Sequence, residues 1–570
     1  MSKRPTFVPN PHAAPPPVRP LSRTLGSRPV RRRDFLNGLL VGASAAVLGG
    51  GLSGCDGGGE TTSPGDDLPP GKDAGDDNTI CHQVRDGQTW SIPAAEGDAY
   101  DCVIIGGGIS GLVTAYRLGK LGVTNILVLE KDDPPGGYSR LDGPAAAPWA
   151  QAAAYTVYPY NDNLIELYTD LDIVTGLDED DAPILDPKYV LKLPVNSSFI
   201  EGTFYPESWD SGIDGLPYEQ QVKDDLKAFK ADMIAWYEFT GTDGLFAFDT
   251  PTDASTADAD VRALDLVTFA EYIDQRGWSA KVAEFYAPYC RSAFGSEPSE
   301  LSAWAAINFF GSEFQPAMSR PGGNAHLAEA LAGKVGAGKI QTKCFVIQVK
   351  NQGSEEVHVT YLKDGAPKTV RAKTAVYAGP RYLASYVLPD LVAAGRNEGA
   401  SFKYTPYIVA AVHVSKTPAG MGYDNWVQEP MFFTDIIVAD WAGLEDPESA
   451  PLDRPNTLSC YCPLLGDGRR SELLATPFED YEVRILDDLE KVVPGVRETV
   501  TGVDIYRWGH AMLAPGKGFV FGEARAGSQA PEGRIHFANH DVDGLPAFEN
   551  AVGAAYRAAA EVAAALLPPP

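Results

Sequence analysis

The stretch DCVIIGGGISG, residues 101–111, determines the fold class of this chain. Residues 102–105 are apolar and mostly β-branched, as in a parallel strand that is buried on both faces. The glycines of a GxGxxG pattern follow at positions 106, 108 and 111, and residues 112–118 have the pattern of a helix. A strand, a glycine turn and a helix in this order predict the first unit of a Rossmann-type α/β domain.

The next strand places an acidic residue where the ribose of a dinucleotide would lie. Residues 125–129 form this strand, and Glu130 follows 19 residues after Gly111. Gly106 permits the tight turn, Gly108 lets the backbone approach the pyrophosphate, and Gly111 lets the helix pack on the strand. The helix N-terminus attracts phosphate, and Glu130 can accept hydrogen bonds from the ribose hydroxyls. The predicted cofactor contacts of this unit are Gly106, Gly108, Ile109, Ser110, Gly111, Glu130 and Lys131.

Residues 131–140, KDDPPGGYSR, resemble the second glycine signature of the flavin-containing amine oxidase superfamily. In that family a Gly-Gly pair, here Gly136 and Gly137, lets the chain wrap over the FAD pyrophosphate, and a nearby arginine adds positive charge. The resemblance assigns this role to Arg140, although the family's arginine usually follows the glycine pair directly. FAD is therefore the expected cofactor, and we expect no metal.

A central region resembles the same superfamily. RPGGN at residues 320–324, followed by a helical pattern over 326–331, is similar to the turn that returns the chain to the FAD domain. A strand over residues 340–349 then places Val346 where the family's adenine-contacting valine lies. The resemblance therefore adds Val346 to the expected cofactor contacts.

The C-terminal region resembles the superfamily as well. RIHFANHD at residues 534–541 is similar to a strand and turn that precede a long helix, here expected over 546–566. In relatives the N-terminus of this helix points at the flavin and stabilises negative charge on the reduced ring. The resemblance implies that Ala551 and Val552 contact the cofactor and that Asp541 holds the ribityl chain. The variant spellings of these motifs resemble the spermidine dehydrogenase branch most.

The matching segments alternate with segments of other character, which predicts two interleaved domains. The expected fold class is α/β, with a Rossmann-type FAD-binding domain interleaved with an α+β substrate domain, as in amine oxidases. The substrate is expected to bind where the two domains meet, against the flavin face. The expected segments are a signal at 1–54, a flexible linker at 55–95, FAD-binding parts at 96–150, 316–395 and 516–570, and substrate-domain parts at 151–315 and 396–515.

The resemblance implies oxidation of an amine by hydride transfer to flavin N5, with the protein supplying position and exclusion of water. Trp508 is the first candidate for the aromatic wall of the pocket, followed by Tyr407 and Trp426, with core packing as the alternative for all three. His510 is either a polar or basic group near the substrate or a structural histidine.

Flavin oxidases commonly hold a water near N5 with a lysine, and the corresponding position here is about Ala410. The nearest lysines are Lys403 and Lys416. This difference favours a dehydrogenase that passes electrons to a carrier. Oxygen, a quinone and a cytochrome all stay open as acceptors.

The N-terminus has the pattern of an export signal. RRRDFL at residues 31–36 is a twin-arginine pattern, and a weakly apolar stretch follows at 38–52. LSGC at residues 52–55 resembles a lipobox, so we expect cleavage before Cys55 and lipidation of that cysteine; an ordinary signal peptide is the alternative. The enzyme is therefore expected in the periplasm or cell envelope, attached to the membrane only through its lipid.

The chain carries a formal net charge of −29. A protein this acidic repels nucleic acid and anionic lipid; the charge either serves solubility or attracts a cationic substrate. A small amine, including a polyamine, is the favoured substrate. The alternatives are oxidation or desaturation of a lipid-like isoprenoid substrate and a catalytically silent flavin-binding protein.

Overall fold

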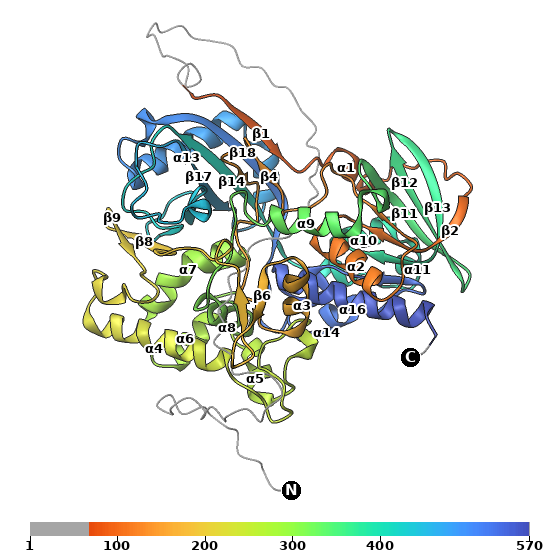
Figure 1. The fold of residues 1–570 in the computed structure, drawn as a ribbon, viewed down its shortest axis with the longest axis horizontal. Helices are drawn as coiled ribbons and strands as arrows, with labels where there is room; N and C mark the ends of the chain where they lie inside the picture. The colour runs from red at the N-terminus through yellow and green to blue at the C-terminus, as the bar shows by residue number, and fades with distance from the viewer. Residues whose placement is uncertain (1–67, 569–570) are drawn as a thin grey trace, which may run out of the picture.

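The computed structural model describes residues 68–568. The predicted export signal, the predicted lipidation site Cys55 and the first part of the predicted linker lie outside the described residues. Within the described range no helix is long and apolar enough to cross a membrane, and no three metal-binding side chains gather. The two lobes of the molecule lie side by side, and the chain passes between them several times (Figure 1).

One domain is built on a seven-stranded sheet whose central strands are parallel. Strand β2 pairs with β3 on one side and with β13 on the other, so that Ile104 lies beside Val128 and Val376. All three side chains are fully buried, as the apolar runs of these strands predict. The strands of this sheet are β2 (Glu96–Ile105), β3 (Ile126–Leu129), β10 (Ile340–Gln341), β11 (Cys344–Gln352), β12 (Glu356–Lys363), β13 (Ala366–Tyr377) and β19 (Ile535–Phe537).

Three helices pack together on this sheet, with α2 between α9 and α16. The strand, turn and helix formed by β2 and α2 confirm the predicted α/β class and its Rossmann-type unit. The helices of this domain are α2 (Ile109–Lys120), α9 (Ala325–Val335), α10 (Arg381–Val387), α11 (Pro389–Ala393), α14 (Glu523–Gln529), α15 (His540–Asp543) and α16 (Phe548–Leu566).

The other domain is built on an eight-stranded sheet in the order β1-β18-β14-β17-β16-β15-β8-β9. Its central strands are antiparallel and almost wholly buried, because helices cover them. Helices α12 (Arg469–Ala475) and α13 (Phe478–Val492) pack near β14 and β18. The strands are β1 (Gly71–Gly75), β8 (Asn196–Ile200), β9 (Thr203–Pro206), β14 (Tyr404–Val414), β15 (Asp424–Val427), β16 (Asp435–Val438), β17 (Asn456–Pro463) and β18 (Val500–Leu513).

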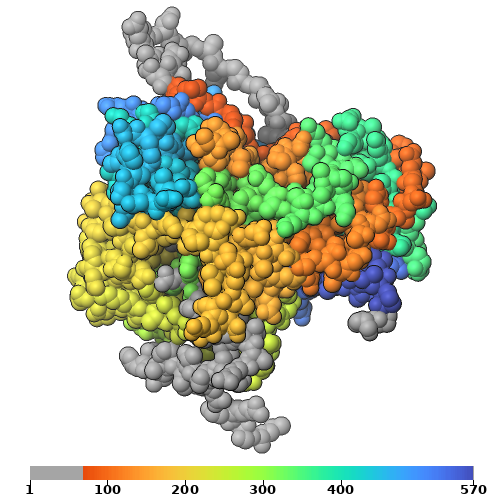
Figure 2. Space-filling view, in the orientation of Figure 1, coloured from red at the N-terminus to blue at the C-terminus, as the bar shows by residue number. Residues whose placement is uncertain are grey.

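A helical lobe completes this domain and packs against the sheet through α7. Its core is a cluster of aromatic rings around Phe310, whose ring centre lies 4.8 Å from that of Tyr289 and 5.1 Å from that of Phe269. In the space-filling view the yellow residues of this lobe lie directly against blue residues from a later part of the chain (Figure 2). The helices are α4 (Gln220–Tyr237), α5 (Ala259–Ala263), α6 (Phe269–Gln275), α7 (Ala280–Phe294) and α8 (Ala303–Glu313), whereas α3 (Asp162–Asp170) packs against α16 of the first domain.

Two small sheets and one further helix lie outside these groups. Strand β4 pairs with β5, and β6 pairs with β7. Their bounds are β4 (Leu141–Asp142), β5 (Trp149–Ala150), β6 (Val174–Leu177) and β7 (Pro183–Leu185), and the helix is α1 (Thr79–Arg85).

Part of the segment expected to be a flexible linker at 55–95 is folded. Strand β1 adds to the edge of the eight-stranded sheet by pairing in parallel with β18, and α1 packs near α10. The Gly/Pro/Asp composition of this segment is typical of a linker. The segment is nevertheless ordered, because it forms hydrogen bonds with a strand more than four hundred residues later in the chain. The linker prediction is therefore corrected for the residues from β1 onward.

Two smaller expectations also change. The strand expected over 340–349 is divided into β10 and β11, because Lys343 has a left-handed backbone with φ of 56°. The polar turn expected at residues 538–541 contains the start of the short helix α15, which Asn539 caps by accepting a hydrogen bond from the Asp541 N–H at 3.0 Å.

We predict that Phe310→Ala lowers the free energy of unfolding by about 3–5 kcal/mol, since it empties the centre of a packed aromatic cluster. Leu266→Ala is the control, because that side chain is 62% exposed, and its cost should stay within about 0.5 kcal/mol. Urea unfolding followed by tryptophan fluorescence measures both. Equal effects of the two substitutions would contradict the assigned core.

Candidate active site

The glycine turn between β2 and α2 is tightest at Gly106 and Gly111. Gly106 has φ of 103° and donates its N–H to the Leu129 carbonyl at 2.8 Å. A methyl group on Gly111 would lie 1.9 Å from the Gly106 carbonyl oxygen. Gly108 stands as the N-cap of α2 in extended backbone. The first turn of α2 is therefore held against the end of β2, with its free N–H groups at the sheet edge.

Glu130 lies at the end of β3, beside this turn, and is 6% exposed. Its two carboxylate oxygens accept hydrogen bonds from the Gly107 N–H at 2.5 Å and the Asp132 N–H at 2.8 Å. Burial, with the nearby charge of Asp132, raises the pKa of Glu130. A buried acceptor at this point matches the predicted ribose acid.

The second glycine pair closes over the first turn. The Gly136 N–H donates to the Gly107 carbonyl at 2.9 Å, and a methyl group on Gly137 would lie 3.2 Å from the Gly108 α-carbon. Both glycines of the pair have positive φ, 143° and 61°. The two predicted signatures thus meet in space, and any larger residue would separate them.

Two adjoining cavities lie along these turns and share Gly106, Glu130, Lys131, Gly379 and Pro380. The residues at one end include the predicted adenine contact Val346. Those at the other end include Gly108, Ile109, Ser110, Gly137, Tyr138, Asn539, His540 and Ala551.

The residues around these cavities fit FAD. The glycine backbone and the N-terminus of α2 can hold the pyrophosphate, and Glu130 can hold the ribose. At the far end the Tyr138 hydroxyl is buried and has no hydrogen-bond partner within residues 68–568. Buried polar groups in proteins normally have a hydrogen-bond partner. A polar cofactor bound in the glycine cradle would supply the missing partner of this hydroxyl.

The other predicted cofactor contacts have close partners within the protein. Lys131 forms ion pairs with Asp76 at 2.7 Å and with Asp132 at 2.8 Å, although it also lines both cavities. Arg140 pairs with Asp132 at 3.2 Å and lies 6.0 Å from the ring centre of Trp508. Val552 is buried inside α16.

Asp541, expected at the ribityl chain, turns to the protein interior. It is fully buried and accepts hydrogen bonds from the Arg381 N–H and the Tyr404 hydroxyl, both at 2.8 Å. Asn539 and His540 line the cavity in its place, because α15 redirects the chain after β19.

Trp508 lies at the boundary of the two domains. Its ring centre is 4.8 Å from that of Tyr138, and its indole N–H donates to the Gln151 carbonyl at 3.2 Å. The structure therefore brings this predicted pocket residue against the second glycine signature.

His510 is stacked on Tyr382, with ring centres 4.2 Å apart and an angle of 18° between the planes. Burial, with the positive charges of Arg470 and His82, lowers the pKa of His510 well below its usual value. The imidazole is therefore neutral at physiological pH and acts as a packed ring beside the domain boundary.

The side of the eight-stranded sheet that carries Trp508, here called the inner face, is defined by the register of its strands. Tyr407 lies opposite Trp508, and Tyr461 lies opposite both Val409 and Asp435. Alternate residues of a strand share a face, so these side chains form one row across the sheet. The Tyr461 hydroxyl donates to the Ala152 carbonyl at 2.6 Å, which places the row against the segment after β5.

Buried acids complete this row. Ser292 on α7 lies 2.8 Å from the Tyr407 hydroxyl and donates to Asp435 at 2.7 Å. Asp424 shares the inner face, and the Tyr155 hydroxyl donates to it at 3.0 Å. Both carboxylates are fully buried. Burial, with the charge of Asp424, raises the pKa of Asp435 well above its usual value.

Ala410, where a lysine was sought, is on the opposite face. Ile408, two residues earlier, lies on the same face as Ala410 and pairs with Arg507. The Arg507 guanidinium donates to the Leu473 carbonyl, so this face is turned toward α12. The inner face of β14 instead presents Val409 and Ala411, again without lysine. The two flanking lysines, Lys403 and Lys416, are exposed beyond the strand ends.

Sequence reasoning missed Tyr138, Ser292, Asp424 and Asp435. A signal existed for Asp435, which is the one acid in the apolar stretch FFTDIIVA, residues 432–439. Ser292 and Tyr138 had no comparable signal, since their roles come from contacts between distant segments.

Comparison with known proteins finds relatives along most of the chain. The sequence profile of the flavin containing amine oxidoreductases matches residues 109–563. The oxidoreductase PigB of a Serratia species is 23% identical over 540 residues, which cover 84% of this chain and 77% of PigB. An L-amino acid dehydrogenase of a Synechocystis species is 23% identical over 493 residues, which cover 80% of this chain and 94% of that protein.

Solved structures agree with the fold. A double mutant of putrescine oxidase superposes with a TM-score of 0.60 at 20% sequence identity. The superposition covers 82% of this chain and 99% of the putrescine oxidase chain. The likeness extends to both domains, as coverage of this size requires.

We predict that Gly111→Ala weakens FAD binding by at least about tenfold, because the added methyl group must push α2 off the Gly106 carbonyl. Gly119→Ala in the same helix is the matched control, since no atom lies within 4 Å of the added methyl position. Flavin fluorescence titration of the apoprotein measures both affinities. If the Gly111 variant bound FAD with wild-type affinity, the assignment of this turn as the FAD cradle would be refuted.

Proposed function

Because its sequence matches the family profile over residues 109–563, this chain belongs to the flavin-containing amine oxidoreductase family, and we propose that it oxidises a small cationic amine. It is an oxidoreductase whose cofactor is FAD. The observation that carries the amine proposal is the acid Asp435, fully buried among aromatic residues on the inner face.

The electrostatics of this acid favour a cationic ligand. One oxygen of Asp435 is buried without a hydrogen-bond partner in the described part of the chain, and Asp424 adds a second negative charge nearby. A buried carboxylate without a counter-charge costs free energy and takes up a proton. An ammonium group of the substrate would supply that counter-charge and restore the ionised form.

The aromatic residues of the inner face suit the same ligand. Trp508, Tyr407 and Tyr461 offer aromatic surface against which the methylene groups of an alkyl amine would pack, and π-faces of this kind attract cations. A diamine or polyamine is the proposed substrate class, because one nitrogen can lie at the buried acid while another lies at the flavin. This proposal is finer than the family assignment.

Bound FAD supplies the two-electron acceptor for the substrate C–H bond. The chain's own residues position the substrate and keep water away from it. Trp508 and Tyr138 close the boundary between the domains, while the hydrogen bond from Ser292 holds Asp435 in place. The substrate nitrogen at the flavin must be uncharged, and the apolar surroundings there favour its neutral form.

We propose that electrons leave the flavin to a carrier instead of oxygen. The support is the inner face of β14, where Val409 and Ala411 stand and no lysine is present. The acceptor class, quinone or cytochrome, is decided by experiment.

We also propose that the enzyme is exported by the twin-arginine route and anchored through Cys55. The support is the sequence alone, RRRDFL at 31–36 and LSGC at 52–55. An anchored, exported position fits a dehydrogenase that uses a membrane electron carrier.

We predict that Asp435→Asn lowers kcat/KM for a diamine by about a hundredfold, because a charge-assisted hydrogen bond contributes about 1.5–3 kcal/mol. Anaerobic flavin reduction in stopped flow, with putrescine, spermidine, monoamines and amino acids, measures the effect. The FAD content of the variant should be unchanged, since Asp435 lies outside the cofactor cradle.

Asp480→Asn is the matched control, because Asp480 is exposed on α13 away from the inner face. Equal diamine kinetics for both variants would overturn the assignment of Asp435. If an isoprenoid reduced the flavin and amines did not, the isoprenoid would replace the amine as the proposed substrate. If none of these compounds reduced the flavin, the protein would be a catalytically silent flavoprotein.

We predict that Arg32→Lys combined with Arg33→Lys retains the enzyme in the cytoplasm, because the twin-arginine receptor reads this pair. Cys55→Ser should be exported but released from the membrane. Cell fractionation with immunoblotting measures both. Membrane-bound, exported Cys55→Ser protein would contradict the lipid anchor.

A further inference from the structure

The segment from Gly71 to Arg85, here called the strap, crosses from one domain to the other. It comprises β1 and α1 and lies outside the region that matches the family profile. In Figure 1 it runs over the top of the molecule from the β18 side toward α10. At each end, the strap contacts an element of the candidate active site.

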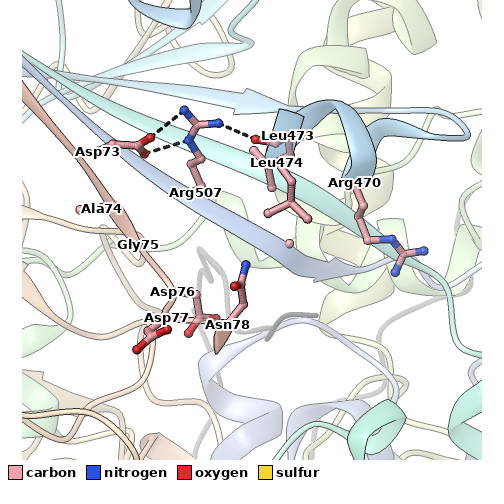
Figure 3. Close-up of a pocket in the computed structure, with 11 residues that line it drawn as sticks. Asp73, Ala74, Gly75, Asp76, Asp77, Asn78, Arg470, Leu473, Leu474 and Arg507 are labelled. Atoms are coloured by element: carbon pink, nitrogen blue, oxygen red, sulfur yellow. Dashed lines mark hydrogen bonds and ion pairs between the residues drawn. The ribbon is translucent and has the colours of Figure 1, made fainter. Parts of the chain in front are cut away.

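The first end of the strap is fixed to β18, the strand that carries Trp508. Gly71 to Gly75 pair in parallel with Val503 to Arg507. Asp73 forms an ion pair with Arg507 at 2.7 Å, whose guanidinium also donates to the Leu473 carbonyl (Figure 3). The chain leaves the sheet at Gly75, where a methyl group would lie 2.3 Å from the Arg507 carbonyl oxygen.

The second end of the strap reaches the cofactor cradle. Asp76 has a side chain that is 2% exposed, and it pairs at 2.7 Å with Lys131, the residue after the ribose acid. Cys81 and Val84 of α1 form part of the wall of the cavity that also contains Glu130 and Val346. The strap therefore supplies two side chains to the wall at the adenine end of the site and an ion-pair partner to Lys131, which lines the same cavity.

The strap is held lightly between these two ends. A cavity of about 400 Å³ lies beneath its turn, lined by residues 73–78 of the strap and by Arg470, Leu473, Leu474, Arg507 and Gly509 (Figure 3). Helix α1 is only seven residues long and fully buries Cys81 alone. A segment with so few buried contacts opens more readily than the core around it.

We propose that the strap is part of the FAD site and closes over the adenine end of the bound cofactor, so that release of FAD requires the strap to lift. The closed position joins the adenine end to β18, and therefore also ties the two domains together. Cofactor loading then precedes closure, and a loaded enzyme retains its flavin.

Linkage gives a test that needs no substitution. If the closed strap binds FAD more tightly than the open strap, FAD must favour closure by the same factor. Trypsin cleavage after Arg85 should therefore be at least about tenfold slower in the holoenzyme than in the apoprotein. Cleavage after Arg497, an exposed residue of the other domain, serves as the internal reference. Equal protection at both sites would overturn the proposal.

Two glycine variants test the release rate directly. Gly75→Ala should release FAD at least about tenfold faster than the parent enzyme, because the added methyl group forces the turn away from β18. Gly87→Ala is the matched control: it also has positive φ, 83°, but no atom lies within 4 Å of the added methyl position. Flavin fluorescence after dilution of the holoenzyme measures release.

A second variant covers the case in which Gly75→Ala does not fold. Asp76→Asn removes the ion pair to Lys131 and should also speed release, whereas Asp86→Asn, an exposed residue just beyond the strap, should not. The proposal would be refuted if Asp76→Asn released FAD at the rate of the parent enzyme and Gly75→Ala either did the same or did not fold. Each readout concerns flavin binding and is independent of the amine substrate.

Discussion

The close approach of α2 to the end of β2 is the constraint on which the rest of the structure depends. Gly111 lies so near the Gly106 carbonyl that only a hydrogen atom fits between them. This contact places the first turn of α2 at the sheet edge, where Glu130 and the Gly136–Gly137 turn can meet it. The cradle determines where the flavin ring of a bound cofactor would lie. It therefore also determines where the inner face of the eight-stranded sheet must lie to face that ring.

The substrate side of the molecule is assembled from distant segments. Trp508, Tyr407 and Asp435 come from three strands, and the serine that holds Asp435 comes from α7, 143 residues earlier. In the proposed amine site, the apolar sheet keeps Asp435 protonated when it has no counter-charge, and an ammonium group bound beside it would restore the ionised carboxylate in a place that water screens little.

The sequence predicted those parts of the fold and site that depend on local spacing. Glu130 and the glycines of α2 lie where their separation along the chain requires, and Val346 and Ala551 line the expected cavities. Asp541 could not be placed, because one turn of α15 rotates it away from the cavity. Ala410, the approximate position expected for the family's lysine, lies on the face opposite Trp508, because a shift of one residue in a strand reverses the face. The linker interpretation missed β1, whose hydrogen bonds reach 432 residues along the chain.

The parallel pairing of β1 with β18 has a consequence for the solution behaviour of the protein. Without β1, the peptide groups of β18 from Val503 to Arg507 would form an open sheet edge. Unpaired edges of this kind recruit strands from other molecules and lead to self-association. A chain that has lost its first folded strand would therefore be prone to aggregate through this edge, even with an intact hydrophobic core.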